Sequence, residues 1–137
     1  MKITLIMPLY NVENYLERAF RSIEEQSIGM ENLHILIVDD CSTDGTYAMA
    51  DSIAKKHKNI ELFQTLKNSG SAGVPRNLAL SKVVTPYIMF LDPDDWLTKD
   101  ACKILYQKAE EYHCKLVKGS CIINGKKFEA AKRDTLL

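Results

Sequence analysis

Three aspartates, Asp92, Asp94 and Asp95, follow directly after a run of apolar residues at positions 88–91. Such a run, bounded by turn-forming residues, is typical of a strand buried on both faces. Neighbouring carboxylates repel one another, which is costly unless a cation or a hydrogen-bond network offsets the repulsion. Carboxylates at the carboxyl edge of an α/β sheet commonly hold a divalent ion and a phosphate-bearing ligand. The pattern therefore predicts a site for a metal and a phosphate.

Three earlier loops, each following a predicted strand, carry polar residues that suit the same ligand. Asp39 and Asp40 can accept hydrogen bonds from a base or a ribose, and the ring of Tyr10 offers a face for stacking. Gly70 loosens the backbone near Arg76, whose fixed positive charge suits a phosphate. Because the carboxyl ends of parallel strands meet at one edge of a sheet, we expect the four loops to converge.

The hydrophobic pattern predicts the elements that must position these loops. We expect a strand followed by a helix, four times over, and then a hairpin with a tight turn at Asn124-Gly125. This order implies an α/β fold with a mostly parallel sheet and helices on both of its faces. The predicted strands cover residues 2–9, 33–38, 60–65, 85–91, 116–123 and 126–129, and the predicted helices cover residues 14–26, 43–56, 73–81 and 99–113.

Composition narrows the function classes. The 137 residues suit one domain, and the formal net charge of zero gives no basic excess for nucleic-acid binding. No segment reaches the ~18 apolar residues of a membrane span. The four cysteines have no metal-binding spacing and are interpreted as free thiols of a cytoplasmic protein.

The four loops, taken in order, resemble glycosyltransferase family 2, inverting enzymes with the Rossmann-like GT-A fold that use nucleotide sugars. The resemblance covers roughly residues 3–100. Its motifs are Ile6-Met7-Pro8-Leu9-Tyr10-Asn11 with Tyr15-Leu16, Ile37-Val38-Asp39-Asp40-Cys41-Ser42-Thr43-Asp44-Gly45-Thr46, Asn68-Ser69-Gly70 through Gly73, Arg76 and Asn77, and Phe90-Leu91-Asp92-Pro93-Asp94-Asp95-Trp96.

This resemblance implies a role for each matching residue. The backbone of Pro8 and the ring of Tyr10 would bracket a uracil, and Asp40 would hydrogen-bond its edge, with Asp39 beside it. Arg76 would lie near the base or the diphosphate. The predicted nucleotide-binding residues are Pro8, Tyr10, Asn11, Asp39, Asp40, Gly70, Arg76 and Asp92. Asp94 is the favoured ligand of Mg²⁺ or Mn²⁺ in the family's Asp-x-Asp motif, with Asp92 and Asp95 as the alternatives.

The resemblance also implies a reaction and partners. A sugar would pass from a UDP-sugar to a hydroxyl of a saccharide or lipid-linked acceptor, as in cell-surface polysaccharide biosynthesis. Family members usually run well past this length, and we find no general base in the sequence. We therefore expect residues 1–137 to form the nucleotide-sugar-binding half, with the base and the acceptor half beyond Leu137. The full-length protein would be cytoplasmic or peripheral at the inner face of the membrane, and a homodimer is left open.

Other interpretations of the same residues remain. The chain could be a catalytically silent nucleotide-binding fragment. A signalling receiver domain also clusters acids at strand ends, but its acidic pair should follow the first strand, which here ends in Pro-Leu-Tyr-Asn. Taken singly, Asp94 and Asp95 could open the next helix, Arg76 could be a salt-bridge partner, and Trp96 could close the loop over its strand.

Overall fold

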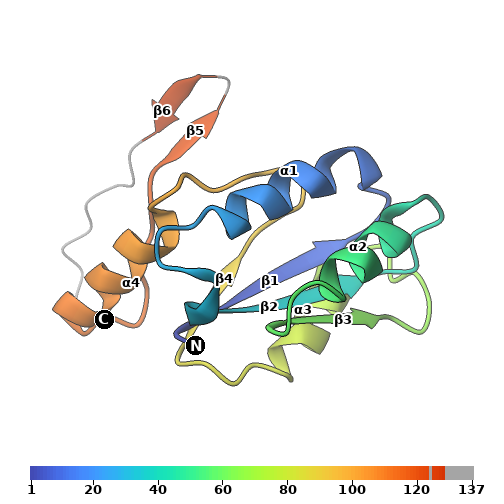
Figure 1. The fold of residues 1–137 in the computed structure, drawn as a ribbon, viewed down its shortest axis with the longest axis horizontal. Helices are drawn as coiled ribbons and strands as arrows, with labels where there is room; N and C mark the ends of the chain where they lie inside the picture. The colour runs from blue at the N-terminus through green and yellow to red at the C-terminus, as the bar shows by residue number, and fades with distance from the viewer. Residues whose placement is uncertain (124, 129–137) are drawn as a thin grey trace.

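Strands and helices alternate along the chain, as predicted (Figure 1). The computed structural model describes residues 1–123 and 125–128. The main sheet contains β1 (Ile3–Leu9), β2 (Leu33–Asp39), β3 (Ile60–Gln64) and β4 (Tyr87–Phe90). The helices are α1 (Glu13–Glu24), the 3-10 turn η1 (Met30–Asn32), α2 (Thr46–Ala54), α3 (Gly73–Leu80) and α4 (Ala101–Tyr112). A hairpin of β5 (Cys121–Ile123) and β6 (Lys126–Phe128) follows.

The four strands of the main sheet are all parallel and lie in the order β3-β2-β1-β4. Side chains alternate across each strand, so the sheet carries apolar side chains on both faces, and helices cover both of them. On one face, residues of α1, α2 and α4 pack against Leu5 and Ile37. On the other face, Ala79 of α3 packs against Ile6 and Leu36. The expected parallel α/β fold is therefore confirmed.

The strand order reverses between β1 and β4, and the two strands separate before β1 ends. Their pairing stops at Ile6 and Phe90, whereas β1 stays paired with β2 as far as Leu9. The N–H of Leu91 donates to the carbonyl oxygen of Ile6 at 3.1 Å. Because the backbone N–H and carbonyl groups of alternate residues point to the same side of a strand, position 8 of β1 also faces the side of β4. Pro8, which has no N–H, falls past the end of β4, where a proline is tolerated inside a central strand. A crevice opens there.

β4 corrects one prediction. Its residues were expected to be buried on both faces, but Ile88 is 45% exposed and Phe90 is 48% exposed. β4 is an edge strand of the main sheet, and α3 packs over β1 and β2. Tyr87 and Met89 do pack against the core on the opposite face. An apolar run alone does not reveal that one of its two faces lacks a covering helix.

Several element boundaries also differ from the predictions. The second helix begins at Thr46 rather than at residue 43, because the Asp44 side chain accepts from the N–H of Thr46 at 2.9 Å and forms a turn. The predicted strand at 116–123 is a strand only at Cys121–Ile123, and Glu129 and Asn124 lie outside the described residues. Within the described part of the chain, no helix is long and apolar enough to cross a membrane.

Candidate functional site

A cavity of about 540 Å³ opens where β1 and β4 separate. All four predicted loops contribute to its lining, so the expected convergence is observed. Seven of the predicted site residues line it, namely Pro8, Tyr10, Asp40, Gly70, Arg76, Asp92 and Asp94. The other three, Asn11, Asp39 and Asp95, are not part of the lining.

Asp40 is a buried carboxylate at the floor of this cavity. Its oxygens accept hydrogen bonds from Thr65 Oγ1 at 2.7 Å, from the Ser69 N–H at 2.9 Å and from Ser69 Oγ at 2.8 Å. Burial alone would raise the pKa of Asp40, but these hydrogen bonds outweigh burial and hold the pKa below its ordinary value of 3.8. Asp40 is therefore a fixed, ionised acceptor that joins the loop after β2 to the loop after β3.

Asp39 is fully buried and points into a different set of donors. Its carboxylate accepts from the N–H of Ser42 at 3.0 Å, from the Ser42 hydroxyl and from Gln64 Nε2 at 2.9 Å. Cys41 lies between these residues with a left-handed φ of 59°, which turns the chain sharply after Asp40. The geometry makes Asp39 the internal support of the loop that carries Asp40.

Asn11 connects this loop to the loop after β1. Its backbone N–H donates to Ser42 Oγ at 3.0 Å, and its side-chain oxygen accepts from the N–H of Thr43 at 2.8 Å. Glu13 adds a contact of the same kind, because its carboxylate accepts from the N–H of Gly45 at 2.6 Å. Asn11 itself has a left-handed φ of 51°, a conformation in which Asn is enriched. The loops carrying Tyr10 and Asp40 are thus held together as one unit.

Arg76 projects from the first turns of α3 and forms an ion pair with Asp92. Its guanidinium carbon lies 5.6 Å from the ring centre of Phe90. Arg76 Nε is buried and has no hydrogen-bond partner in the described part of the chain. Arg76 is therefore a salt-bridge partner, as one of the interpretations proposed. Its unpaired Nε–H is also available as a hydrogen-bond donor beside the cavity.

The acidic residues form a tight turn at the cavity mouth. The N–H of Asp95 donates to the carbonyl oxygen of Asp92 at 3.0 Å, and Pro93 supplies the φ that the second position of such a turn favours. The carboxylates of Asp94 and Asp95 are exposed, and within residues 1–123 and 125–128 no hydrogen bond or ion pair reaches them. Trp96, which follows this turn, is 57% exposed, and whether it closes the loop over its strand stays a prediction.

The carboxylates of the acidic turn fit a divalent cation only in part. Among the described residues, no three Asp, Glu, His or Cys side chains gather closely enough to hold a metal ion. Mg²⁺ sites in nucleotide-binding proteins commonly use one or two carboxylates and complete their shell with phosphate oxygens and water. The carboxylates of Asp94 and Asp95, which form no ion pair with the described residues, match that incomplete type of site.

Some lining residues were not predicted as site residues. Tyr15, on α1, is 47% exposed and stands with Tyr10 at the cavity wall. Asn68 donates from Nδ2 to the carbonyl oxygen of Asp40 at 3.0 Å. Both residues lie within the motifs quoted above, so their position in those motifs was the available signal. Pro75, in the first turn of α3, is a buried part of the same wall.

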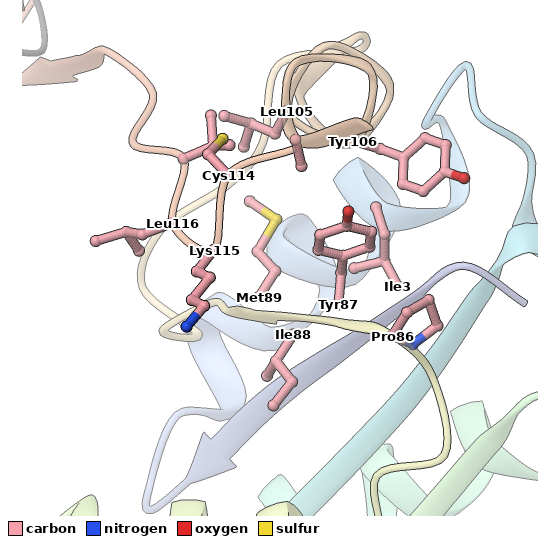
Figure 2. A pocket seen from close by; sticks show the side chains of 12 residues that line it. Ile3, Pro86, Tyr87, Ile88, Met89, Leu105, Tyr106, Cys114, Lys115 and Leu116 are labelled. Carbon is pink, nitrogen blue, oxygen red and sulfur yellow. The ribbon is translucent and has the colours of Figure 1, made fainter. Parts of the chain in front are cut away.

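A second cavity, of about 280 Å³, lies beside β4 and α4 (Figure 2). Its lining is mainly apolar and includes Met89, Leu105 and Leu116, and none of the predicted site residues contributes to it. At its edge the Tyr87 hydroxyl donates to Glu110 at 2.6 Å, and this hydrogen bond raises the pKa of Tyr87 to about 12. The charged groups suited to a nucleotide belong to the first cavity.

Comparison with known proteins identifies the family. Residues 4–136 match the family model described as glycosyl transferase family 2, and the chain belongs to that family. A curated relative is the poly(ribitol-phosphate) beta-N-acetylglucosaminyltransferase TarS of Staphylococcus aureus strain Mu50, which is 34% identical over 113 residues. That alignment covers 82% of this chain and 20% of TarS, so the chain spans about a fifth of the length of this relative.

Solved structures confirm the GT-A fold. The crystal structure of residues 1–349 of S. aureus TarS in complex with UDP is similar at 32% identity and a TM-score of 0.84, over 92% of this chain and 37% of that one. The mannosyltransferase PcManGT from Pyrobaculum calidifontis, in complex with GDP-Man and Mn²⁺, is similar at 28% identity and a TM-score of 0.63. That match covers 69% of this chain and 28% of PcManGT.

Proposed function

We propose that residues 1–137 form the nucleotide-sugar-binding half of an inverting, metal-dependent glycosyltransferase whose donor is a UDP-sugar. The observation that carries this proposal is the cavity at the point where β1 and β4 separate. Ligands of open α/β sheets bind in such a crevice, beyond the carboxyl ends of the strands. The UDP in the TarS crystal structure supports the choice of nucleotide.

In this proposal the floor of the cavity holds the base. Tyr10 and the backbone of Pro8 bracket the uracil ring, and the fixed carboxylate of Asp40 accepts a hydrogen bond from its N–H edge. Because Asp40 is ionised and can act only as an acceptor, it suits the N–H edge of uracil, and the UDP bound to TarS supports uracil over the other bases that offer an N–H. Asp39 and Asn11 act through the loop, by holding Asp40 and Tyr10 in place. Gly70 leaves room for the ribose, since among the described residues, its own chain neighbours aside, no atom lies within 4 Å of the position that a side chain would occupy there.

The mouth of the cavity holds the diphosphate and the metal. Arg76 donates to phosphate oxygens, and Asp94 is the direct metal ligand, with Asp92 or Asp95 as a second. A bound Mg²⁺ or Mn²⁺ would neutralise charge that develops on the leaving diphosphate. The acceptor oxygen forms a bond to the anomeric carbon from the face opposite UDP, and the bond from that carbon to the phosphate oxygen breaks. The acceptor proton passes to a general base, which we still expect beyond Leu137.

The acceptor is proposed to be a hydroxyl of a cell-surface polymer. The name of TarS specifies poly(ribitol-phosphate) as the polymer that this relative modifies, which makes a polyol-phosphate chain the first acceptor to test. It specifies N-acetylglucosamine as the transferred sugar, so UDP-GlcNAc is the first donor to test.

Titration calorimetry with UDP tests the proposal directly. We expect UDP to bind in the presence of Mn²⁺, more weakly after chelation with EDTA, and more tightly than GDP or CDP. Absence of metal-dependent UDP binding would sink the proposal. Consumption of UDP-GlcNAc in the presence of poly(ribitol phosphate) then distinguishes a transferase from a silent fragment. A silent fragment would bind UDP without consuming the donor.

A further inference from the structure

Arg18, an exposed residue of α1, contacts the acidic turn at two points. Its Nη2 donates to the carbonyl oxygen of Asp94 at 3.1 Å. Its guanidinium carbon also lies 4.1 Å from the ring centre of Trp96, in a cation–π arrangement. One side chain therefore holds the main chain of the turn at Asp94 and the first large side chain that follows it.

This contact is the first of a row along α1. Ser22 Oγ accepts from the N–H of Leu97 at 3.0 Å, and Gln26 Nε2 donates to the carbonyl oxygen of Thr98 at 2.8 Å. Residues 18 and 22 are four apart and lie along one side of α1, and Gln26 follows two residues after the end of that helix. Ser22 and Gln26 are buried, whereas Arg18 is exposed and contacts the acidic turn itself. The row fixes the path of the chain from Asp94 onward.

Asp94 depends on this support because its carboxylate has none of its own. No hydrogen bond or ion pair reaches that carboxylate from the described residues. The direction of the Asp94 carboxylate is set by the backbone of the turn. Pro93 constrains this backbone through its fixed φ, and Arg18 constrains it through the hydrogen bond to the Asp94 carbonyl oxygen. We propose that Arg18 is a positioning residue that aims the Asp94 carboxylate at the cation that would accompany the diphosphate. This inference rests on the metal role proposed above.

The sign of the expected effect separates positioning from simple electrostatics. Arg18 is a positive charge beside a cation-binding turn, so its Coulomb effect opposes metal binding. If charge alone mattered, Arg18→Ala would raise the affinity for Mn²⁺ and Arg18→Lys would leave it unchanged. A positioning role predicts that both variants bind Mn²⁺ more weakly, because lysine keeps the charge but lacks the planar group that stacks on Trp96.

Two measurements on the wild-type protein, Arg18→Ala, Arg18→Lys and Arg21→Ala test this. Arg21 is the matched control, because it is an arginine of the same helix that pairs with Glu17 at 3.2 Å, away from the turn. The first measurement is the Mn²⁺ concentration that gives half of the metal-dependent UDP binding. We expect it to rise about tenfold in Arg18→Ala, the scale for removing an outer support of a metal ligand, and to stay at the wild-type value in Arg21→Ala.

The second measurement needs no metal or nucleotide. Trp96 is the sole tryptophan of the chain, so acrylamide quenching of its fluorescence reports the packing of Arg18. We expect more efficient quenching in both Arg18 variants and no change in Arg21→Ala. Unchanged Mn²⁺ dependence in the Arg18 variants would overturn the positioning role, as would a higher affinity in Arg18→Ala. A change in quenching without metal-dependent UDP binding in the wild type would instead overturn the proposed metal role.

Discussion

Arg76 and Asp92 form an ion pair that spans the mouth of the cavity, from the start of α3 to the end of β4. Among the cavity-lining residues that the structure describes, Arg76 is the sole cation. The pair is half-exposed, with side-chain exposures of 32% and 47%, so it contributes little to stability. Its arrangement instead suits an exchange of partners, in which a diphosphate takes the guanidinium and Asp92 is released.

Arg76→Ala is therefore expected to weaken UDP binding by about tenfold or more, the scale of a hydrogen bond to a charged group. Uridine, which lacks the diphosphate, should bind the variant and the wild type equally. Lys82→Ala on the segment after α3 serves as a control for the loss of a positive charge. Titration of UDP and uridine into each variant provides the measurement. A matching loss of uridine affinity would place Arg76 at the base rather than at the phosphates.

Asp40→Asn is expected to lower the free energy of unfolding at pH 7 by about 1–3 kcal/mol, because the amide cannot accept from all the donors around Asp40. The folded-state pKa of Asp40 lies below its ordinary value of 3.8, so ionised Asp40 stabilises the fold above that pH. This stabilisation is lost as the pH falls below 3.8 and through the folded-state pKa. Urea denaturation of both proteins from pH 7 downward should therefore show a difference that narrows in acid.

Asp39→Asn tests whether the neighbouring carboxylate supports the loop rather than the ligand. It should destabilise the fold by about 1–3 kcal/mol, since the amide keeps only one of the two oxygens that accept from Ser42 and Gln64. It should weaken UDP binding less than Asp40→Asn does. Asp51→Asn, which removes an exposed carboxylate paired with Lys55, is the control and should change stability by less than about 0.5 kcal/mol. A larger loss of UDP affinity for Asp39→Asn than for Asp40→Asn would contradict this division of roles.

The contrast between Asp39 and Asp40 also marks what the sequence can predict. The convergence of the four loops follows from the order of strands and helices, because parallel strands end at one edge of their sheet. The two adjacent aspartates cannot be ranked in that way. Their difference depends on Ser69 and Gln64, which are distant in the sequence and meet them only after folding. The sequence therefore predicts the location of the site and leaves the internal roles open.

The exposed face of β4 and the polar row on α1 were missed for related reasons. The apolar run at Ile88 and Phe90 fixes a strand, but its burial depends on which helices cover that part of the sheet. Arg18, Ser22 and Gln26 look like ordinary polar residues of an amphipathic helix until the loop that they contact is known. In both cases a tertiary neighbour, rather than a local preference, determines the outcome.

Asp94→Ala is expected to abolish the increase in UDP affinity that Mn²⁺ produces, while the affinity measured in EDTA stays near that of the wild type. Asp95→Ala should retain most of the increase, because Asp94 lines the cavity and Asp95 does not. Neither change should lower the free energy of unfolding by more than about 0.5 kcal/mol, since both side chains are exposed and removal of either relieves repulsion within the turn. Calorimetry with and without Mn²⁺, paired with thermal unfolding, measures both effects. An Asp95→Ala variant that loses the Mn²⁺ effect while Asp94→Ala keeps it would move the metal ligand to Asp95.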